Sequence, residues 1–484
     1  MQRLPTRLWL AFLALGCGCS TGSLEPDFTS VEHIVAERTG QRVHWDQALP
    51  EDEQARKAVQ DLLQQPLTRD AAVQVALLRN ARLQAVFEEL SIAQADLVQA
   101  GALANPVLGV ELRGPGRPSW PLEIHVIEDF MNVATRALRQ RVAESEIERA
   151  QAEVTQAALA LAADVRGAFI AVQAAQQIAE MRATVVEATS ASVDAAAGLV
   201  QAGNMPDVDL DHERALDGQA RLDRALAEAE LLERRERLTT LLGVWGEDTS
   251  WTIAERLPEP PSLEVASTGL ETLAIEQRLD LAASRHAIEA AARELGLTDA
   301  TALIPSIDAG LHSETEPDGV TTIGPSLDLP LPIFDTGRAR VARGQALLRR
   351  VQQEYRALAV EIRSEVRAAY ARMLAARTRA EYLRGVLVPL RVRIVEQTQL
   401  LYNGMQVGVF ELLRSKQEEI DTGRDSLEAL ADYWQARTEL ERAVGGRLSA
   451  PGSPESVESS PETAPMQHGE GHDDEQSHQH GDHP

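Results

Sequence analysis

The sequence predicts a mainly helical chain with a small β part, and three observations support this fold class. Only 4% of the 484 residues are aromatic, while Ala, Leu, Glu, Gln and Arg dominate the middle of the chain, as is typical of long helices. The chain also repeats itself at a spacing of about 200 residues. Finally, each repeat contains two short strand-like segments between Gly- and Pro-rich stretches.

The internal repeat rests on three pairs of landmarks that come in the same order in both halves. They are Ala76 and Ala274 (274 − 76 = 198), Pro106 and Pro305 (305 − 106 = 199), and Gly203 and Gly404 (404 − 203 = 201). A nearly constant offset between ordered landmarks indicates a duplication. Each half is therefore expected to contain a helix, two strands, a long helix, a turn and another long helix.

The predicted strands cover residues 106–112, 122–127, 305–311 and 320–329. Their length suits a tilted membrane barrel, in which about 9–11 residues cross the bilayer. Four strands cannot close a barrel, because the edge strands would leave backbone groups unpaired in lipid. Closure must come from several chains, and three chains with four strands each would give a barrel of twelve strands.

The long helix of the first half is predicted over residues 136–200, which contain no proline. Its Ala and other apolar residues recur in steps of three and four, the pattern of a coiled coil. The matching helix, over residues 338–402, contains Pro389 and should kink or break there,. Gly203 and Gly404 follow these helices, and glycine is the usual stop. Each half should therefore end in a helical hairpin.

The first twenty residues have the order of an export signal, with basic residues followed by the apolar run 8–15 and then small residues,. This run is too short to span a bilayer as a helix. Cys17 and Cys19 are the only cysteines and lie where the signal would be cut. The arrangement resembles a lipoprotein signal with Cys17 as the acylated residue; Cys19 and an ordinary signal peptide are the alternatives.

The chain carries a net charge of −27, and the segment from Pro451 onward contributes eight acidic residues and no Lys or Arg. An acidic surface repels phosphate backbones, which argues against nucleic acid as a partner. This tail lacks the apolar residues needed for a core. It contains five histidines, namely His468, His472, His478, His480 and His483. They are expected to bind metal ions weakly and transiently; the alternative is a solvated tail that binds metal only in the test tube.

Several short segments together carry a family resemblance. Pro66-Leu67-Thr68, Asn105-Pro106, the heptapeptide Pro-Ile-Phe-Asp-Thr-Gly-Arg at 332–338 and the two tip glycines occur in order along residues 67–446. This set resembles the outer-membrane efflux factor family typified by TolC. Residues 130–136 depart from the pattern, because the usual Gly-Gly-Arg is absent there.

The resemblance implies a TolC-like homotrimer with a 12-stranded transmembrane β-barrel, four strands per chain, continued by a coiled-coil α-helical tunnel in the periplasm. It implies a passive channel, held in the outer membrane by lipid, on whose tips a periplasmic adaptor and a proton-driven inner-membrane pump dock. The chain has no phosphate loop, nucleophile elbow or paired-histidine protease motif, so neither an enzyme nor a resident cofactor is expected.

The expected division is a lipoprotein signal peptide (1–16), an N-terminal periplasmic segment (17–66), the first repeat (67–244), an equatorial linker (245–268), the second repeat (269–446) and a disordered acidic, His-rich tail (447–484).

The hairpin tips contain the candidate functional residues. Gly203 and Gly404 mark the surfaces for adaptor docking, and Asp207, Asp209 and Glu411 are the candidates for a periplasmic gate. Three chains would place these carboxylates in rings, which favour cations. The alternative is that Asp207 or Asp209 only caps the helix that follows.

The second tip, residues 402–413, is similar to those of family members associated with heavy-metal resistance, which favours copper or a related ion as cargo. Met405 could be a soft ligand or a packed side chain. Drug or solvent export and type I secretion are alternatives within the same architecture. A structural coiled-coil lipoprotein of the cell envelope is the alternative from another class.

Overall fold

The computed structural model describes residues 23–47, 49–112, 122–316 and 318–448. Nearly all of these belong to one unit, made of residues up to Pro260 and the stretch Ala266–Arg447, while Pro261–Val265 and Leu448 belong to a second unit. The two cysteines and the five tail histidines lie outside the described residues. The following description concerns the first unit.

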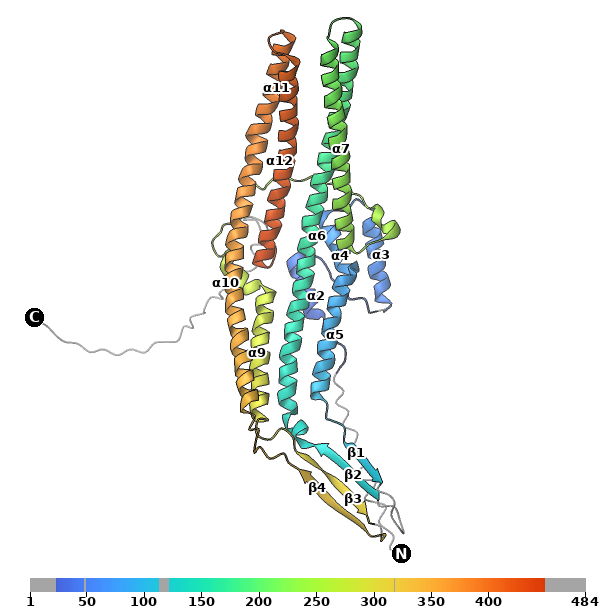
Figure 1. Cartoon of the computed structure of the whole chain (residues 1–484), viewed down its shortest axis with the longest axis vertical. Coiled ribbons are helices and arrows are strands. Elements are labelled where there is room, and N and C mark those ends of the chain that lie inside the picture. Colours follow the sequence, from blue (N-terminus) through green and yellow to red (C-terminus); the bar gives the residue numbers. More distant parts are fainter. Residues whose placement is uncertain (1–22, 48, 113–121, 317, 449–484) are drawn as a thin grey trace, which may run out of the picture. The chain divides into compact units, whose positions relative to one another are not determined.

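The described elements alternate between helices and strands in the same order in both halves (Figure 1). Two helices come first, α2 (Thr29–Thr39) and α3 (Glu51–Leu63). The first half then contains α4 (Arg69–Arg79), α5 (Ala81–Gly101), β1 (Val107–Leu112), β2 (Leu122–Asp129), α6 (Phe130–Gln201) and α7 (Asp207–Leu242). After the short helix η1 (Gly246–Ser250), the second half contains α8 (Leu270–Gln277), α9 (Leu279–Ala300), β3 (Asp308–Thr315), β4 (Thr321–Asp328), α10 (Arg338–Tyr382), η2 (Leu383–Leu387), α11 (Val388–Asn403) and α12 (Val409–Val444).

The long helix of the first half begins earlier than the sequence predicted. α6 starts at Phe130 because the carboxylate of Asp129 accepts hydrogen bonds from the amides of Met131 (2.9 Å) and Asn132 (3.3 Å). Such a cap satisfies amides that have no partner within the helix. This side-chain cap comes directly before residues 130–136, where the usual Gly-Gly-Arg is absent. In the second half the corresponding helix is preceded by Gly337, which is left-handed with φ 72°.

The predicted break at Pro389 is a π-helical turn. α10 passes into η2 and then into α11, in which Pro389 is one of the first residues. Proline has no amide hydrogen and its ring crowds the carbonyl four residues earlier. A π-turn widens the helix at this place, which lets the chain continue toward the tip.

The duplication extends to individual packing contacts. Gly243 and Gly445 both end the second helix of a hairpin with positive φ, 72° and 93°. A Cβ on Gly243 would lie 2.9 Å from the carbonyl oxygen of Arg79, and one on Gly445 would lie 3.3 Å from Gln277. Each glycine therefore lets its hairpin pack onto the junction of the two short helices in its own half.

A hydrophobic core joins α2, α4, α5, α6 and α7. Phe28, Trp45 and Phe87 form an aromatic cluster in it, with ring centroids 4.9–6.3 Å apart. Trp251 is fully buried and donates a hydrogen bond from Nε1 to the hydroxyl of Thr239 (3.2 Å). α6 contains a stretch apolar enough to cross a membrane, but more than half of that stretch is buried within the protein. It is therefore the central helix of this core.

Candidate functional site

The four strands form one antiparallel sheet in the order β1-β2-β3-β4, which joins the hairpins of the two halves through β2 and β3 (Figure 1). Because successive side chains point to opposite faces, the register assigns each strand residue to a face. One face carries large apolar side chains, namely Leu108, Val110, Leu112, Leu122, Ile124, Val126, Leu311, Ile323 and Leu327. Ile323 is 72% exposed and Leu108 64%. An exposed apolar face of this extent is suited to lipid.

The opposite face of the sheet is polar. It presents two successive rows of residues that run across the four strands. The first row is Gly109, His125, His312 and Gly324, and the second row is Glu111, Glu123, Glu314 and Thr322. A sheet with one apolar and one polar face has the pattern of a membrane barrel wall that separates lipid from a water-filled lumen.

Both edges of this sheet are open in the described part of the chain. β1 pairs only with β2, and β4 pairs only with β3. An open edge is not tolerated in lipid, where backbone groups have no water to bond. In lipid, a sheet with these edges would need further strands on both sides.

At the far end of α6 from the sheet, residues 202–206 form the turn of the first helical hairpin. Ala202 stays in the helical region, Gly203 is left-handed with φ 74°, and the amide of Asn204 donates to the carbonyl of Leu199 (2.8 Å). Asp207 and Asp209 lie in the first turn of α7, where the N-cap is Pro206 without a side-chain hydrogen bond. Neither aspartate is therefore the cap of this helix.

The turn of the second hairpin has the same geometry, but its left-handed residue comes one position after the glycine. Gly404 is the C-cap of α11, as predicted, but its φ is −83° and it is not left-handed. Met405 adopts the left-handed conformation instead, with φ 57°, and the amide of Gln406 donates to the carbonyl of Leu401 (2.9 Å). Met405 is 95% exposed in the single chain. The residue equivalent to Gly203 is thus Met405.

In this alignment, the gate candidates Asp209 and Glu411 occupy equivalent positions in the two hairpins. Asp209 donates its amide to the carbonyl of Pro206 (3.1 Å), and Glu411 donates its amide to that of Gly408 (3.2 Å). Both lie in the first turn of the second helix of a hairpin, where the helix dipole favours negative side chains,. The structure thus places one carboxylate at the same position of each tip.

The two hairpins contact one another near their tips. The ring of His212 on α7 meets that of Phe410 on α12 edge-to-face, with centroids 4.2 Å apart. Further along, the buried guanidinium of Arg182 on α6 lies 3.3 Å from a carboxylate oxygen of Asp223 and 3.9 Å from one of Asp421. Asp223 belongs to α7 and Asp421 to α12, so Arg182 connects three helices.

Between these contacts lies a mainly apolar groove of about 420 Å³. Its apolar lining comes from both hairpins and includes Met181, Val185, Val392, Val395 and Ile420. Side chains therefore do not fill the space between the hairpins here. The distance between the two hairpins depends on the contacts at either end of the groove.

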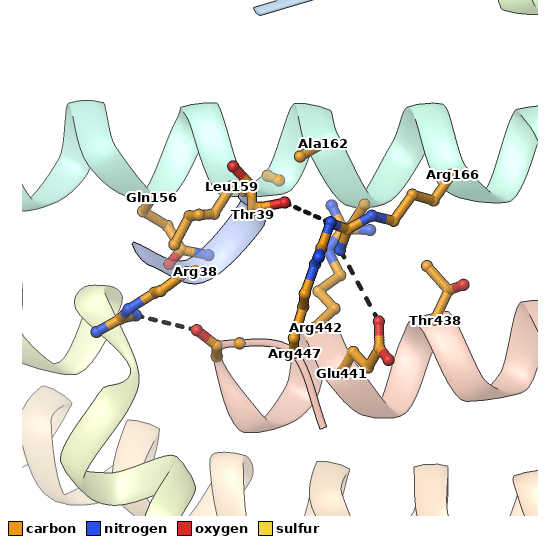
Figure 2. Close-up of a pocket in the computed structure, with 14 residues that line it drawn as sticks. Arg38, Thr39, Gln156, Leu159, Ala162, Arg166, Thr438, Glu441, Arg442 and Arg447 are labelled. Carbon is orange, nitrogen blue, oxygen red and sulfur yellow. Dashed lines mark hydrogen bonds and ion pairs between the residues drawn. The ribbon is translucent and has the colours of Figure 1, made fainter. Parts of the chain in front are cut away.

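A cluster of polar side chains joins the two halves around a small cavity of about 40 Å³ (Figure 2). Arg38 donates to the carbonyls of Gln277 (2.7 Å) and Gly445 (3.0 Å). The guanidinium of Arg166 lies 3.8 Å from the Glu441 carboxylate and donates to the carbonyl of Thr39 (3.5 Å). Burial raises the pKa of Glu441 and lowers that of Arg166. The contacts of Arg38 and Arg166 each join different elements. The cluster therefore fastens α2 and α6 to α12.

Two groups of possible metal ligands also occur among the described residues. One consists of Glu123, His125 and His312 on the polar face of the sheet, and the other of Glu148, His286 and Glu289 on α6 and α9. The sequence analysis did not find them. Histidines separated by 187 positions (312 − 125) become neighbours only when the strand register is known.

Comparison with known proteins agrees with this architecture. Residues 270–446 match the family model described as outer membrane efflux protein. This segment, the second of the two repeats, belongs to the outer membrane efflux protein family. The open sheet edges and the apolar sheet face are consistent with this membership.

Relatives and solved structures are similar to both halves of the chain. It is 24% identical over 389 residues to the cobalt-zinc-cadmium resistance protein CzcC of Cupriavidus metallidurans, covering 78% of this chain and 90% of that one. A membrane protein from Pseudomonas aeruginosa superposes with a TM-score of 0.67 at 19% identity, covering 80% and 93% of the two chains. The CmeC outer membrane channel of Campylobacter jejuni gives 0.66 at 14% identity, covering 78% and 85%. These likenesses confirm the predicted TolC-like fold.

Proposed function

We propose that three copies of this chain form the outer-membrane channel of a tripartite system that exports divalent metal cations from the periplasm. Four strands per chain would close a barrel of twelve strands. The observation that carries the proposal is the sheet itself, which has one apolar face, one polar face and two open edges. Three copies joined edge to edge would leave no backbone group unpaired in lipid.

In this channel the helical hairpins would extend into the periplasm. We propose that the turns around Gly203 and Gly404 form the surface on which a periplasmic adaptor and a proton-driven inner-membrane pump dock. Asp207, Asp209 and Glu411 would form acidic rings at the narrow end, which favour the passage of cations. We further propose that acylation of Cys17, or alternatively Cys19, anchors the chain in the membrane.

The assignment of metal as cargo has two supports. The relative CzcC is named for resistance to cobalt, zinc and cadmium. The chain also ends in a segment with five histidines, namely His468, His472, His478, His480 and His483, and imidazole binds copper, zinc and nickel well. We propose that this segment collects the ion near the channel without acting as a resident cofactor site.

The proposal is tested by deleting the gene and measuring metal tolerance and cellular metal content for copper, zinc, cobalt, nickel, cadmium and silver. The deletion is complemented with the natural chain and, in parallel, with a chain in which the five tail histidines are replaced by asparagine. Sensitivity to one ion together with its accumulation supports metal export and identifies the cargo. Unchanged tolerance to every ion, with lost tolerance to drugs or solvents, would instead support the drug-export alternative.

A further inference from the structure

The polar face of the sheet contains a group of side chains with the chemistry of a transition-metal site. His125 on β2 and His312 on β3 are directly paired across the two strands. Glu123 lies two residues before His125 and therefore on the same face. The candidate ligand atoms of these three residues all lie within 4.8 Å of one another.

Two glycines shape the surroundings of the two histidines. In their row across the sheet, His125 and His312 are flanked by Gly109 and Gly324. A Cβ on Gly109 would lie only 2.0 Å from Nε2 of His125, so the imidazole occupies the space that a side chain there would fill. Nothing lies within 4 Å of the corresponding position on Gly324. The glycines thus keep the row open on the polar face.

Carboxylates hold the imidazole of His312 from two sides. Its Nδ1 lies 3.4 Å from Oε1 of Glu123, and its Nε2 lies 3.8 Å from Oε2 of Glu314. All three candidate ligands are partly buried, at 34% exposure for the His312 side chain and 18% for that of Glu123. Two carboxylates therefore lie beside the His312 ring.

We infer that Glu123, His125 and His312 bind a divalent transition-metal cation on the polar face of the sheet. Two imidazole nitrogens and one carboxylate oxygen suit copper, zinc, nickel or cobalt, with ligand distances of about 2.0–2.2 Å. The ligand atoms lie within 4.8 Å of one another and would approach further to share one ion. The inference rests on the proposed function for its cargo, because a wall facing the lumen would place this site on the export path, once in each copy of the chain.

The second group of ligands, Glu148, His286 and Glu289, is the weaker candidate for this role. It offers a single imidazole, and the Glu148 side chain is 48% exposed. His286 nevertheless provides a matched control, because its substitution removes one imidazole from the described part of the chain without touching the sheet.

The test measures Cu²⁺ binding to the full-length chain purified in detergent, with the five tail histidines replaced by asparagine. Titration calorimetry gives the number of ions per chain, and electron paramagnetic resonance counts the coordinating nitrogens through their hyperfine splitting. We expect a Cu²⁺ signal with two nitrogens. His125→Ala and His312→Ala should each reduce it to one nitrogen and weaken binding by roughly tenfold or more. His286→Ala should leave the two-nitrogen signal unchanged.

A further variant tests the geometry without removing a ligand. Gly109→Val inserts a side chain into the space of the His125 ring and should weaken Cu²⁺ binding, whereas Gly324→Val, where the space is open, should weaken it less. A two-nitrogen signal that survives in His125→Ala or His312→Ala, or no such signal in the parent protein, would overturn the inference.

The cell assay separates this inference from the proposed function. A chain that binds Cu²⁺ at the sheet but confers no metal tolerance would overturn the proposed cargo and leave the site in place. A chain that confers tolerance but binds no Cu²⁺ at the sheet would overturn the site and leave the proposed cargo in place.

Discussion

The rings of His212 and Phe410 meet edge-to-face at 4.2 Å between centroids and connect the tips of the two helical hairpins. Phe410 lies next to the gate candidate Glu411, and His212 lies three residues after Asp209. The contact is therefore placed to control how far the two acidic positions lie apart.

Phe410→Ala should loosen the tips. An aromatic pair contributes about 0.5–1.5 kcal/mol beyond its buried area, so an equilibrium between closed and open tips would shift by roughly two- to twelvefold. Conductance of the purified channel in planar bilayers measures this shift, and a rise is expected. Phe410→Tyr keeps the ring and should conduct like the natural chain. Equal conductance of the alanine variant and the natural chain would show that this contact does not hold the tips.

Met405→Gly should stabilise the second turn. A left-handed conformation costs a residue with a Cβ roughly 1–2 kcal/mol, and glycine removes this cost while adding some backbone freedom in the unfolded state. Hydrogen exchange of the Gln406 amide, which donates to Leu401, should slow by about two- to tenfold,. The converse change, Gly203→Ala, should speed exchange of the Asn204 amide. Faster exchange in Met405→Gly would contradict this account of the turn.

A pair of neighbouring substitutions tests the assignment of the sheet faces. Ile323 lies on the apolar face and Thr322 on the polar face. A lysine facing lipid near the middle of the bilayer costs about 2–4 kcal/mol, whereas one facing a lumen costs much less. Ile323→Lys should therefore reduce the amount of folded assembly recovered from outer membranes, and Thr322→Lys should not. Similar losses in both variants would mean that the faces are wrongly assigned.

Glu441→Gln should change how stability depends on pH. Burial raises the pKa of the Glu441 carboxyl above its usual 4.5, against the opposing effects of Arg166 and Arg437. The folded chain therefore holds this proton more tightly than the unfolded chain. The resulting stability is fully present below about pH 4.5 and is lost as pH rises through the folded-state pKa. Tm of the natural chain minus Tm of Glu441→Gln should thus fall as the pH rises above about 4.5,.

The control for this experiment is Glu439→Gln, which removes an exposed carboxylate from the same helix. A Tm difference for Glu441→Gln that rises with pH would mean that Arg166 and Arg437, and not burial, dominate at Glu441. Scans at several heating rates are needed, because unfolding of large membrane assemblies is often irreversible.

The duplication, the strand pairs and the helical hairpins could be predicted from sequence because each produces a local pattern. Repeated landmarks, a long run without proline and alternating apolar residues are all visible along the chain. The start of α6 was missed because the helix begins at a side-chain cap, Asp129, and the glycines of the family pattern are absent from residues 130–136. The end of the second long helix at Gly404 was predicted correctly, but glycine content alone does not reveal that Met405 adopts the left-handed conformation of this turn.

The pairing of His125 with His312 could not be predicted, because it depends on the register between strands from different halves. A shift by one residue would move every side chain to the other face. Likewise, the cluster around Glu441 joins helices far apart in the chain. Sequence patterns therefore locate elements well, but they do not determine which residues of distant elements meet.

The adjacency of β2 and β3 also constrains how the protein is made. β2 ends at Asp129 and its neighbour β3 begins at Asp308, about 180 residues later, so the central pair of the sheet cannot form until much of the second half has been synthesised. Until then the first hairpin exposes the apolar side chains of Leu108, Val110 and Ile124 without a neighbour on one side. The incomplete sheet is therefore at risk of aggregation until the second half of the chain supplies its missing neighbour.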